Sequence, residues 1–130
     1  GVLDFMRGSW VGEGHSHGAA VSARLEVISI LDGSWLQASE TMLDTSGEPE
    51  HTDISLYRYD PQEGRLEVLH LMAHATLQRH PVEPVGAALH WITGPGAPRL
   101  AIIPGTLGFR TEVQFSGEAA PCVVIDYKPA

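Results

Sequence analysis

Hydrophobic and polar residues alternate along ten short segments of the chain, and this period of two is typical of β-strands with one buried face. Between the segments lie Gly, Pro, Asp and Ser residues, which favour turns because Gly allows positive φ, Pro fixes φ and Asp caps its own turn. The ten segments are 9–15, 21–31, 35–43, 52–59, 65–74, 76–82, 87–93, 99–103, 109–115 and 122–127. Strands at a spacing of roughly 8–12 residues predict an all-β barrel or sandwich.

The opening segment, 2–7, is the only candidate for a short helix or turn, and its Leu3 and Met6 are placed to plug one end of a barrel. The 14 Gly and 9 Pro residues disfavour long helices. A length of 130 residues suits a single domain, 1–130, and is sufficient for a hydrophobic core.

Alternation also predicts which side chains point into the interior. The clearest case is 109–115, in which every second residue is polar and faces water. An inward charged residue is the most informative kind, because a buried charge must be paired or must meet a ligand. The expected inward sets are Leu36, Ala38, Glu40 and Met42; Ile54, Leu56 and Arg58; Leu66, Val68, His70, Met72 and His74; and Phe109, Thr111, Val113 and Phe115.

Three motifs resemble those of calycin-like β-barrels, which include the fatty-acid-binding proteins, the lipocalins, and the nitrobindin-like and related bacterial barrels. They are G-x-W-x-G-x-G at 8–14, LDGSWL at 31–36 and LYRYDPQEGRL at 56–66. The second and third motifs are most similar to the bacterial group, and the order of all the segments is compatible over nearly the whole chain. The resemblance implies an antiparallel up-and-down calycin-like barrel of about ten strands with a hydrophobic cavity.

The first motif has a structural explanation. Trp10 is expected to close the barrel floor, while Gly12 and Gly14 let the strand bend where the sheet closes. If Trp10 points inward, His15 and His17 point to solvent. The His-Ser-His sequence therefore predicts a solvated pair near a strand end rather than a metal site.

A barrel of about ten strands is wider than its side chains need, so we expect a cavity that binds a small, largely apolar or amphipathic molecule. Arg58 is expected either to bind an acidic group of this molecule or to pair with Glu40, and the sequence does not decide between the two. The candidate ligand-binding residues are Trp10, Leu36, Glu40, Leu56, Arg58, His70, Met72, His74, His90, Phe109, Thr111 and Val113.

The alternative hypothesis is a small barrel enzyme that uses the same cavity. His70 or His74 beside Glu40 would form a catalytic acid–base pair whose pKa values are tuned by burial. The resemblance is compatible with this, because calycin-like barrels include cyclases and isomerases as well as carriers. The chain has no Gly-x-Ser-x-Gly nucleophile motif and no phosphate-binding loop. Carrier and enzyme both stay open.

A haem-binding or metal-binding protein is the third hypothesis. Nitrobindin-like barrels bind haem through a histidine near the C-terminal end of the barrel, whereas the last histidine here is His90. The ligand that the resemblance implies is therefore missing, and haem would depend on His70, His74 or His90. The chain also lacks the tight Cys and His spacing of zinc sites, so we expect no metal and no cofactor.

Charge narrows the range of partners. A formal net charge of −8, from 16 acidic and 8 basic residues, disfavours nucleic acid and anionic membranes. No apolar run approaches the ~20 residues of a membrane span, and the first residues lack the pattern of a signal peptide. The single cysteine, Cys122, makes a cytoplasmic protein the simplest expectation. A homodimer is compatible with the sequence, which does not fix the number of subunits.

Overall fold

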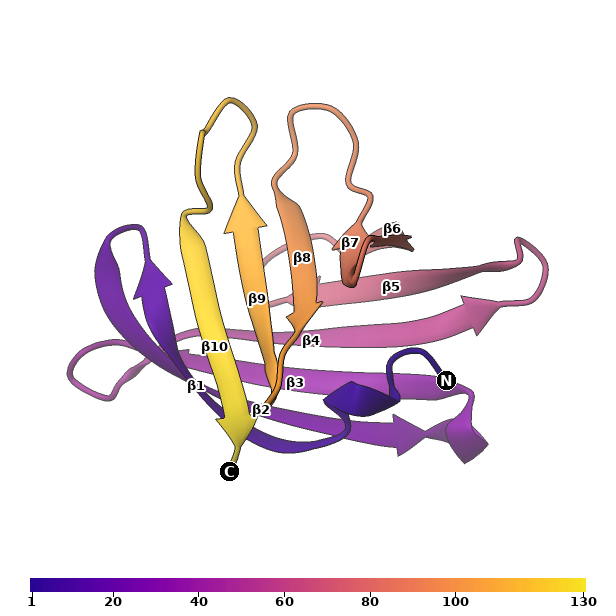
Figure 1. Cartoon of the computed structure of the whole chain (residues 1–130), viewed down its shortest axis with the longest axis horizontal. Helices are drawn as coiled ribbons and strands as arrows, with labels where there is room; N and C mark the ends of the chain where they lie inside the picture. The colour runs from indigo at the N-terminus through magenta and orange to yellow at the C-terminus, as the bar shows by residue number, and fades with distance from the viewer.

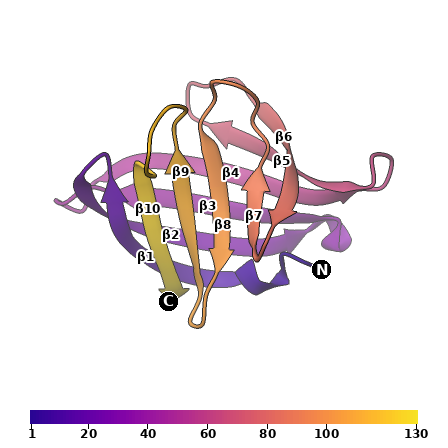
Figure 2. The same ribbon diagram turned by 45° about the horizontal axis from the view of Figure 1, so that its top comes forward.

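Ten antiparallel strands form one closed barrel in the computed structural model, which describes residues 1–130. Each strand pairs with its neighbours in the sequence, and the last strand returns to pair with the first (Figures 1 and 2). The predicted all-β, up-and-down architecture is therefore confirmed. The strands are β1 (Gly8–Ser16), β2 (Ala19–Ile30), β3 (Trp35–Leu43), β4 (Pro49–Asp60), β5 (Arg65–Met72), β6 (Gln78–Val85), β7 (Ala88–Trp91), β8 (Arg99–Pro104), β9 (Phe109–Gln114) and β10 (Val123–Pro129).

The two ends of the barrel differ. The loops from β7 to β8 and from β9 to β10 extend from one end, at the top of Figure 1. The C-terminus and a 3-10 helix, η1 (Asp4–Met6), lie toward the other end. A second 3-10 helix, η2 (Leu31–Gly33), connects β2 to β3.

The seam between β1 and β10 closes the barrel, and it depends on two glycines of β1. A Cβ atom at Gly14 would lie 1.7 Å from the carbonyl oxygen of Val124, and a Cβ atom at Gly12 would lie 2.6 Å from Cγ2 of Ile125. The contact at Gly14 is with backbone, which cannot shift as the end of a side chain can, and the contacts at Gly12 are with the side chains of Ile125 and Tyr127. These positions therefore need glycine for the close approach of two strands.

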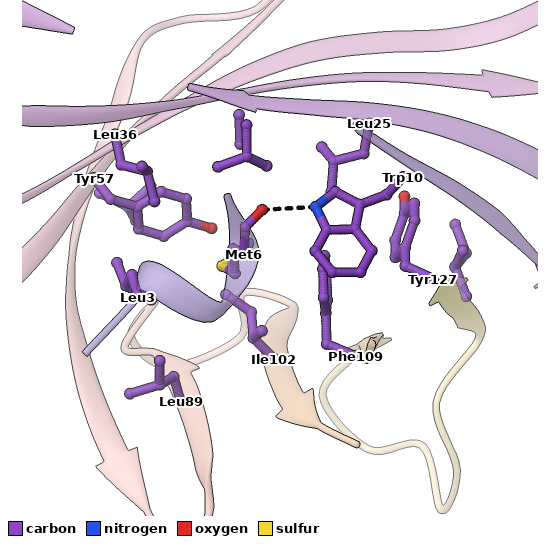
Figure 3. Close-up of a cluster of buried hydrophobic side chains, with 14 of the residues drawn as sticks. Leu3, Met6, Trp10, Leu25, Leu36, Tyr57, Leu89, Ile102, Phe109 and Tyr127 are labelled. Atoms are coloured by element: carbon purple, nitrogen blue, oxygen red, sulfur yellow. Dashed lines mark hydrogen bonds between the residues drawn. The ribbon is translucent and has the colours of Figure 1, made fainter. Parts of the chain in front are cut away.

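Aromatic side chains fill the end of the barrel near η1 (Figure 3). Trp10 Nε1 donates a hydrogen bond of 2.7 Å to the carbonyl oxygen of Met6. The ring of Phe109 meets Trp10 edge-on, with 5.0 Å between centroids, and stacks on Tyr127 at 5.1 Å. Leu3 and Met6 are buried in the same core, as expected, although only the three residues of η1 are helical. We call Trp10, Phe109 and Tyr127 the aromatic plug.

The inward faces predicted for β1, β3 and β9 are confirmed, as is that of β5 as far as Met72. Trp10, Ala38, Val68 and Phe109 are buried at alternate positions of their strands. Alternation identifies these faces because each of the four strands has its polar residues mainly on one side.

The inward face predicted for β4 is wrong by one residue. Tyr57 is buried and lies opposite the buried Leu36 of β3, which determines the parity of the whole strand. Ile54, Leu56 and Arg58 therefore point outward, and Ile54 is 38% exposed. Apolar residues occur on both faces of this strand, so alternation alone does not identify the inner one.

Arg58 belongs to a cluster of charged residues on the outer surface. Its Nε donates to Oε1 of Glu67 at 2.6 Å, and Arg79 donates to both oxygens of the same carboxylate at 2.8 Å. Hydrogen bonds from Arg79 and then from Arg58 lower the pKa of Glu67 to about 2. Contrary to both expectations, Arg58 reaches neither the barrel interior nor Glu40.

Replacing Gly14 with alanine tests the seam. We expect Gly14→Ala to lower the free energy of unfolding by about 3 kcal/mol or more, because the new methyl group would overlap the Val124 carbonyl. Urea denaturation followed by tryptophan fluorescence measures the change. Gly105→Ala is the matched control, because its Cβ would lie 3.7 Å from the nearest atom. Equal losses of stability in the two variants would contradict the close approach.

Candidate functional site

On the side of the aromatic plug away from η1, the interior of the barrel is a cavity of about 850 Å³. Met6 forms part of its inner boundary, next to the aromatic plug. His17, Thr93, Pro98 and Phe115 surround the mouth, and they belong to the connections between strands at the loop end of the barrel. One half of the barrel is thus filled by its own side chains, and the other half is open to a small molecule.

Most of the cavity wall is apolar. Apolar side chains from β3, β5, β8, β9 and β10 contribute to it, and the two methionines add flexible, polarisable surface that adapts to different shapes. The main apolar lining residues are Met42, Met72, Leu100, Ile102, Val113, Val123 and Ile125.

Two carboxyl groups face each other on the cavity wall. Glu40 of β3 and Asp53 of β4 are direct cross-strand partners, which places their Cβ atoms about 5 Å apart. The hydroxyl of Tyr127 donates a hydrogen bond to Oε2 of Glu40. Burial, and next the charge of Asp53, raises the pKa of Glu40 to about 7. Glu40 therefore exchanges its proton near neutral pH, which an ordinary carboxyl group does not.

Two imidazoles flank Asp53 on the same wall. Nε2 of His51 lies 2.8 Å from Oδ2 of Asp53, and Nε2 of His70 lies 3.4 Å from the same oxygen. His51 stands nearer the solvent, with 37% of its side chain exposed, whereas His70 is 13% exposed. The wall thus combines an acid that is protonated up to neutral pH with a carboxylate–imidazole pair.

Trp91 of β7 holds the imidazole side of this wall in place. Its Nε1 donates a hydrogen bond of 3.2 Å to the hydroxyl of Tyr57. The ring of His70 meets Trp91 edge-on at 4.9 Å, and the ring of His80 stacks on Trp91 at 6.1 Å. Burial raises the pKa of Tyr57 above its usual range and lowers that of His80. Both groups are therefore uncharged at neutral pH.

The residues predicted from the sequence fall into three groups. Five candidates line the cavity together: Glu40, His70, Met72, Thr111 and Val113. Three others, Trp10, Leu36 and Phe109, are buried in the core but do not line the cavity. The remaining four, Leu56, Arg58, His74 and His90, do not reach the cavity.

His74 and His90 were misplaced for local reasons. Strand β5 ends at Met72, and His74 follows in an exposed turn with φ of 62°. His90 lies opposite Glu83 on the outer face, because its neighbour Trp91 is the residue that points inward. Of the two histidines proposed as acid–base partners of Glu40, only His70 shares its cavity.

Sequence reasoning missed Asp53, His51 and Trp91. The two β4 residues follow from placing Tyr57 inward, since positions 51, 53, 55 and 57 then share one face. His90 was the expected lining residue of β7, whereas its neighbour Trp91 is the one that is buried and lines the cavity. His17 is exposed, as expected with His15, and the turn after β1 also places its ring at the cavity mouth, with 6.0 Å between its centroid and that of Phe115.

The site does not fit haem held in the manner that the resemblance implies. The histidines that line the cavity are His17, His51, His70 and His80, and none comes from the C-terminal part of the barrel. Two of them, His51 and His70, already face Asp53 through Nε2. Nor does any group of three or more His, Cys, Asp or Glu side chains have an arrangement that would hold a metal ion.

The chain matches no protein-family model, and no curated protein matches it. The closed antiparallel barrel of ten strands is consistent with a calycin-like fold. Neither 3-10 helix has the length and apolar character needed to cross a membrane.

The proton on Glu40 links stability to pH. The folded pKa, about 7, lies above the unfolded value of 4.5, so the folded chain holds this proton through a window in which the unfolded chain loses it. The contribution of Glu40 to stability is thus present below pH 4.5 and is lost as the pH rises through about 7. We expect Glu40→Gln to gain on the order of 3 kcal/mol over wild type between these pH values.

Urea denaturation at pH 4.5 and pH 8 measures this difference. Glu13→Gln, an exposed outward position on β1, is the control and should follow wild type at both pH values. A stability difference between wild type and Glu40→Gln that does not change with pH would show that Glu40 titrates as an ordinary carboxyl group.

Proposed function

We propose that this protein binds a small, largely apolar molecule inside its barrel. The observation that carries the proposal is the cavity of about 850 Å³ with an apolar wall, a polar patch and a mouth between loops. Small-molecule sites commonly have volumes of about 300–1,000 Å³ and are mainly apolar with a few convergent polar groups. A molecule in this cavity would remove apolar side chains from water, which favours binding.

The polar groups of the wall restrict the ligand. The carboxyl groups of Glu40 and Asp53 face the cavity, whereas Arg58 lies outside it. An anionic ligand group beside these carboxyl groups would be repelled at low local dielectric. The ligand group that meets Glu40 and Asp53 is therefore not an anion and forms hydrogen bonds, in place of the acidic group expected opposite Arg58.

We further propose that the chain is related to the nitrobindin-like and similar bacterial barrels. The ten-strand up-and-down topology, the inward Trp10 and the glycine-dependent seam of β1 support this relation. The G-x-W-x-G-x-G motif has two structural roles in β1. Trp10 fills the barrel floor, and the glycines allow the close approach of β10. A carrier of the fatty-acid-binding type shares this arrangement of a plugged barrel and an internal ligand.

Two adjacent valines of β10 give a matched test. Val123 lines the cavity, whereas Val124 points outward between Glu112 and His15. Binding of the neutral probe N-phenyl-1-naphthylamine is followed by its fluorescence. We expect wild type and Val124→Trp to bind with similar affinity. Val123→Trp should bind at least about tenfold more weakly, because its indole fills the cavity; tenfold corresponds to about 1.4 kcal/mol.

Two results would contradict the proposed function. One is that the probe fails to bind wild type. The other is that Val123→Trp and Val124→Trp bind the probe equally, which would place binding on the outer surface. Circular dichroism of both variants establishes that each is folded.

A further inference from the structure

The polar patch of the cavity contains more chemistry than the retention of an apolar ligand needs. Glu40 and Asp53 are cross-strand partners, and His70 reaches Asp53 from the next strand. An apolar ligand would be held as well by uncharged side chains, and a buried acid pair is unfavourable by itself. The three groups form an acid, a base and a group that orients the base, all on one wall.

We propose that the cavity catalyses proton transfer at the carbon next to the carbonyl group of an apolar ketone or aldehyde, with His70 as the base and Glu40 as the acid. This inference rests on the proposed function, because the substrate must first bind in the cavity.

The base is the imidazole of His70. The carboxylate of Asp53 lies 3.4 Å from Nε2 and favours the tautomer that carries its proton there. Nδ1 then keeps the basic lone pair. Asp53 is a positioning residue, in the manner of the carboxylate that orients a catalytic histidine.

The acid is the carboxyl group of Glu40. Tyr127 donates to Oε2 of Glu40, and Glu40 lines the cavity. A protonated Glu40 can therefore donate to a carbonyl oxygen. Buried carboxylic acids that stay neutral near pH 7 act in this way in enzymes that form enols.

The step balances within the site. Nδ1 of His70 takes a proton from the carbon beside the carbonyl, and the electron pair of the broken C–H bond forms a C=C bond. The carbonyl π electrons move to oxygen, which takes the proton of Glu40 to give a neutral enol. The reverse transfers return a proton to carbon and a proton to Glu40. No oxidant, reductant or second substrate is required.

Other chemistries lack their groups here. Ser55 of β4 lies directly opposite His70, but Nε2 of His70 faces the carboxylate of Asp53 rather than a serine hydroxyl. Cys122 does not line the cavity, and its pKa is raised by burial. Glu40 and Asp53 repel an anionic group, such as a phosphate, on their side of the cavity. An uncharged carbonyl compound fits the remaining possibilities.

Hydrogen–deuterium exchange at carbon tests the inference with a defined probe. The full-length protein is incubated with 2-octanone in deuterated buffer, and mass spectrometry follows deuterium uptake beside the carbonyl. Displacement of N-phenyl-1-naphthylamine by 2-octanone reports binding separately. We expect His70→Gln and Glu40→Gln to lose exchange at least about 100-fold when each variant is saturated with 2-octanone. His90→Gln and Glu13→Gln, both on the outer face, should exchange like wild type.

The pH profile separates a chemical role from a structural one. Glu40 is faced by Tyr127 of β10, by Asp53 and His51 of β4 and by His70 of β5. The exchange rate should fall as the pH rises above about 7, because Glu40 then loses its proton. This fall should be absent from the residual rate of Glu40→Gln.

A conservative replacement tests Asp53. Asp53→Asn should lower the exchange rate at saturating 2-octanone, because the carboxylate that orients His70 is lost. Asp53→Glu, which restores a carboxylate, should recover part of the rate. Equal losses of rate in the two variants would show that Asp53 acts only through packing.

Three outcomes decide the matter. Exchange that disappears in both cavity variants while 2-octanone still binds supports the inference. If wild type binds 2-octanone but exchanges no faster than His70→Gln, the inference is overturned and the binding function stands. The same conclusion follows if wild type binds the naphthylamine probe but 2-octanone does not displace it. Failure of wild type to bind the naphthylamine probe overturns the proposed function itself.

Discussion

The close approach of β1 to β10 is the constraint on which the rest of the structure depends. A Cβ atom at Gly14 would overlap the Val124 carbonyl, and one at Gly12 would lie 2.8 Å from the ring of Tyr127. The absence of both side chains lets the sheet close and leaves room for the Tyr127 ring. That ring stacks on Phe109 in the aromatic plug, while its hydroxyl reaches Glu40 at the cavity. The seam therefore joins the filled half of the barrel to the open half.

In the cavity, repulsion between two acidic side chains is offset by the groups around them. The carboxyl groups of Glu40 and Asp53 are held side by side by the β3–β4 register, and like charges in such a pair destabilise a sheet. The structure responds by raising the pKa of Glu40 to about 7 and by placing two imidazoles against Asp53. Groups tuned toward neutral pH in a cavity are typical of functional sites, although ion networks also produce them.

The sequence predicts the number and order of strands, because turn residues separate runs with a clear period of two. It predicts the inner faces of β1, β3 and β9, where polar and apolar residues segregate. It fails at β4, since Ile54 and Leu56 make the outer face as apolar as the inner one, and cross-strand contact of Tyr57 with Leu36 decides instead. Asp53 was therefore missed as a cavity residue, because it shares the inward face of Tyr57. The end of β5 before His74 is set by the turn, which no alternation reveals.

A crystal structure of the protein with bound N-phenyl-1-naphthylamine tests the central claim most directly. The account predicts the probe inside a closed barrel, against Met72 and Val113 and beside the Glu40 wall. Probe density on the outer face of β4 and β5, where Ile54 and Leu71 are exposed, or an interior filled entirely by side chains would contradict it.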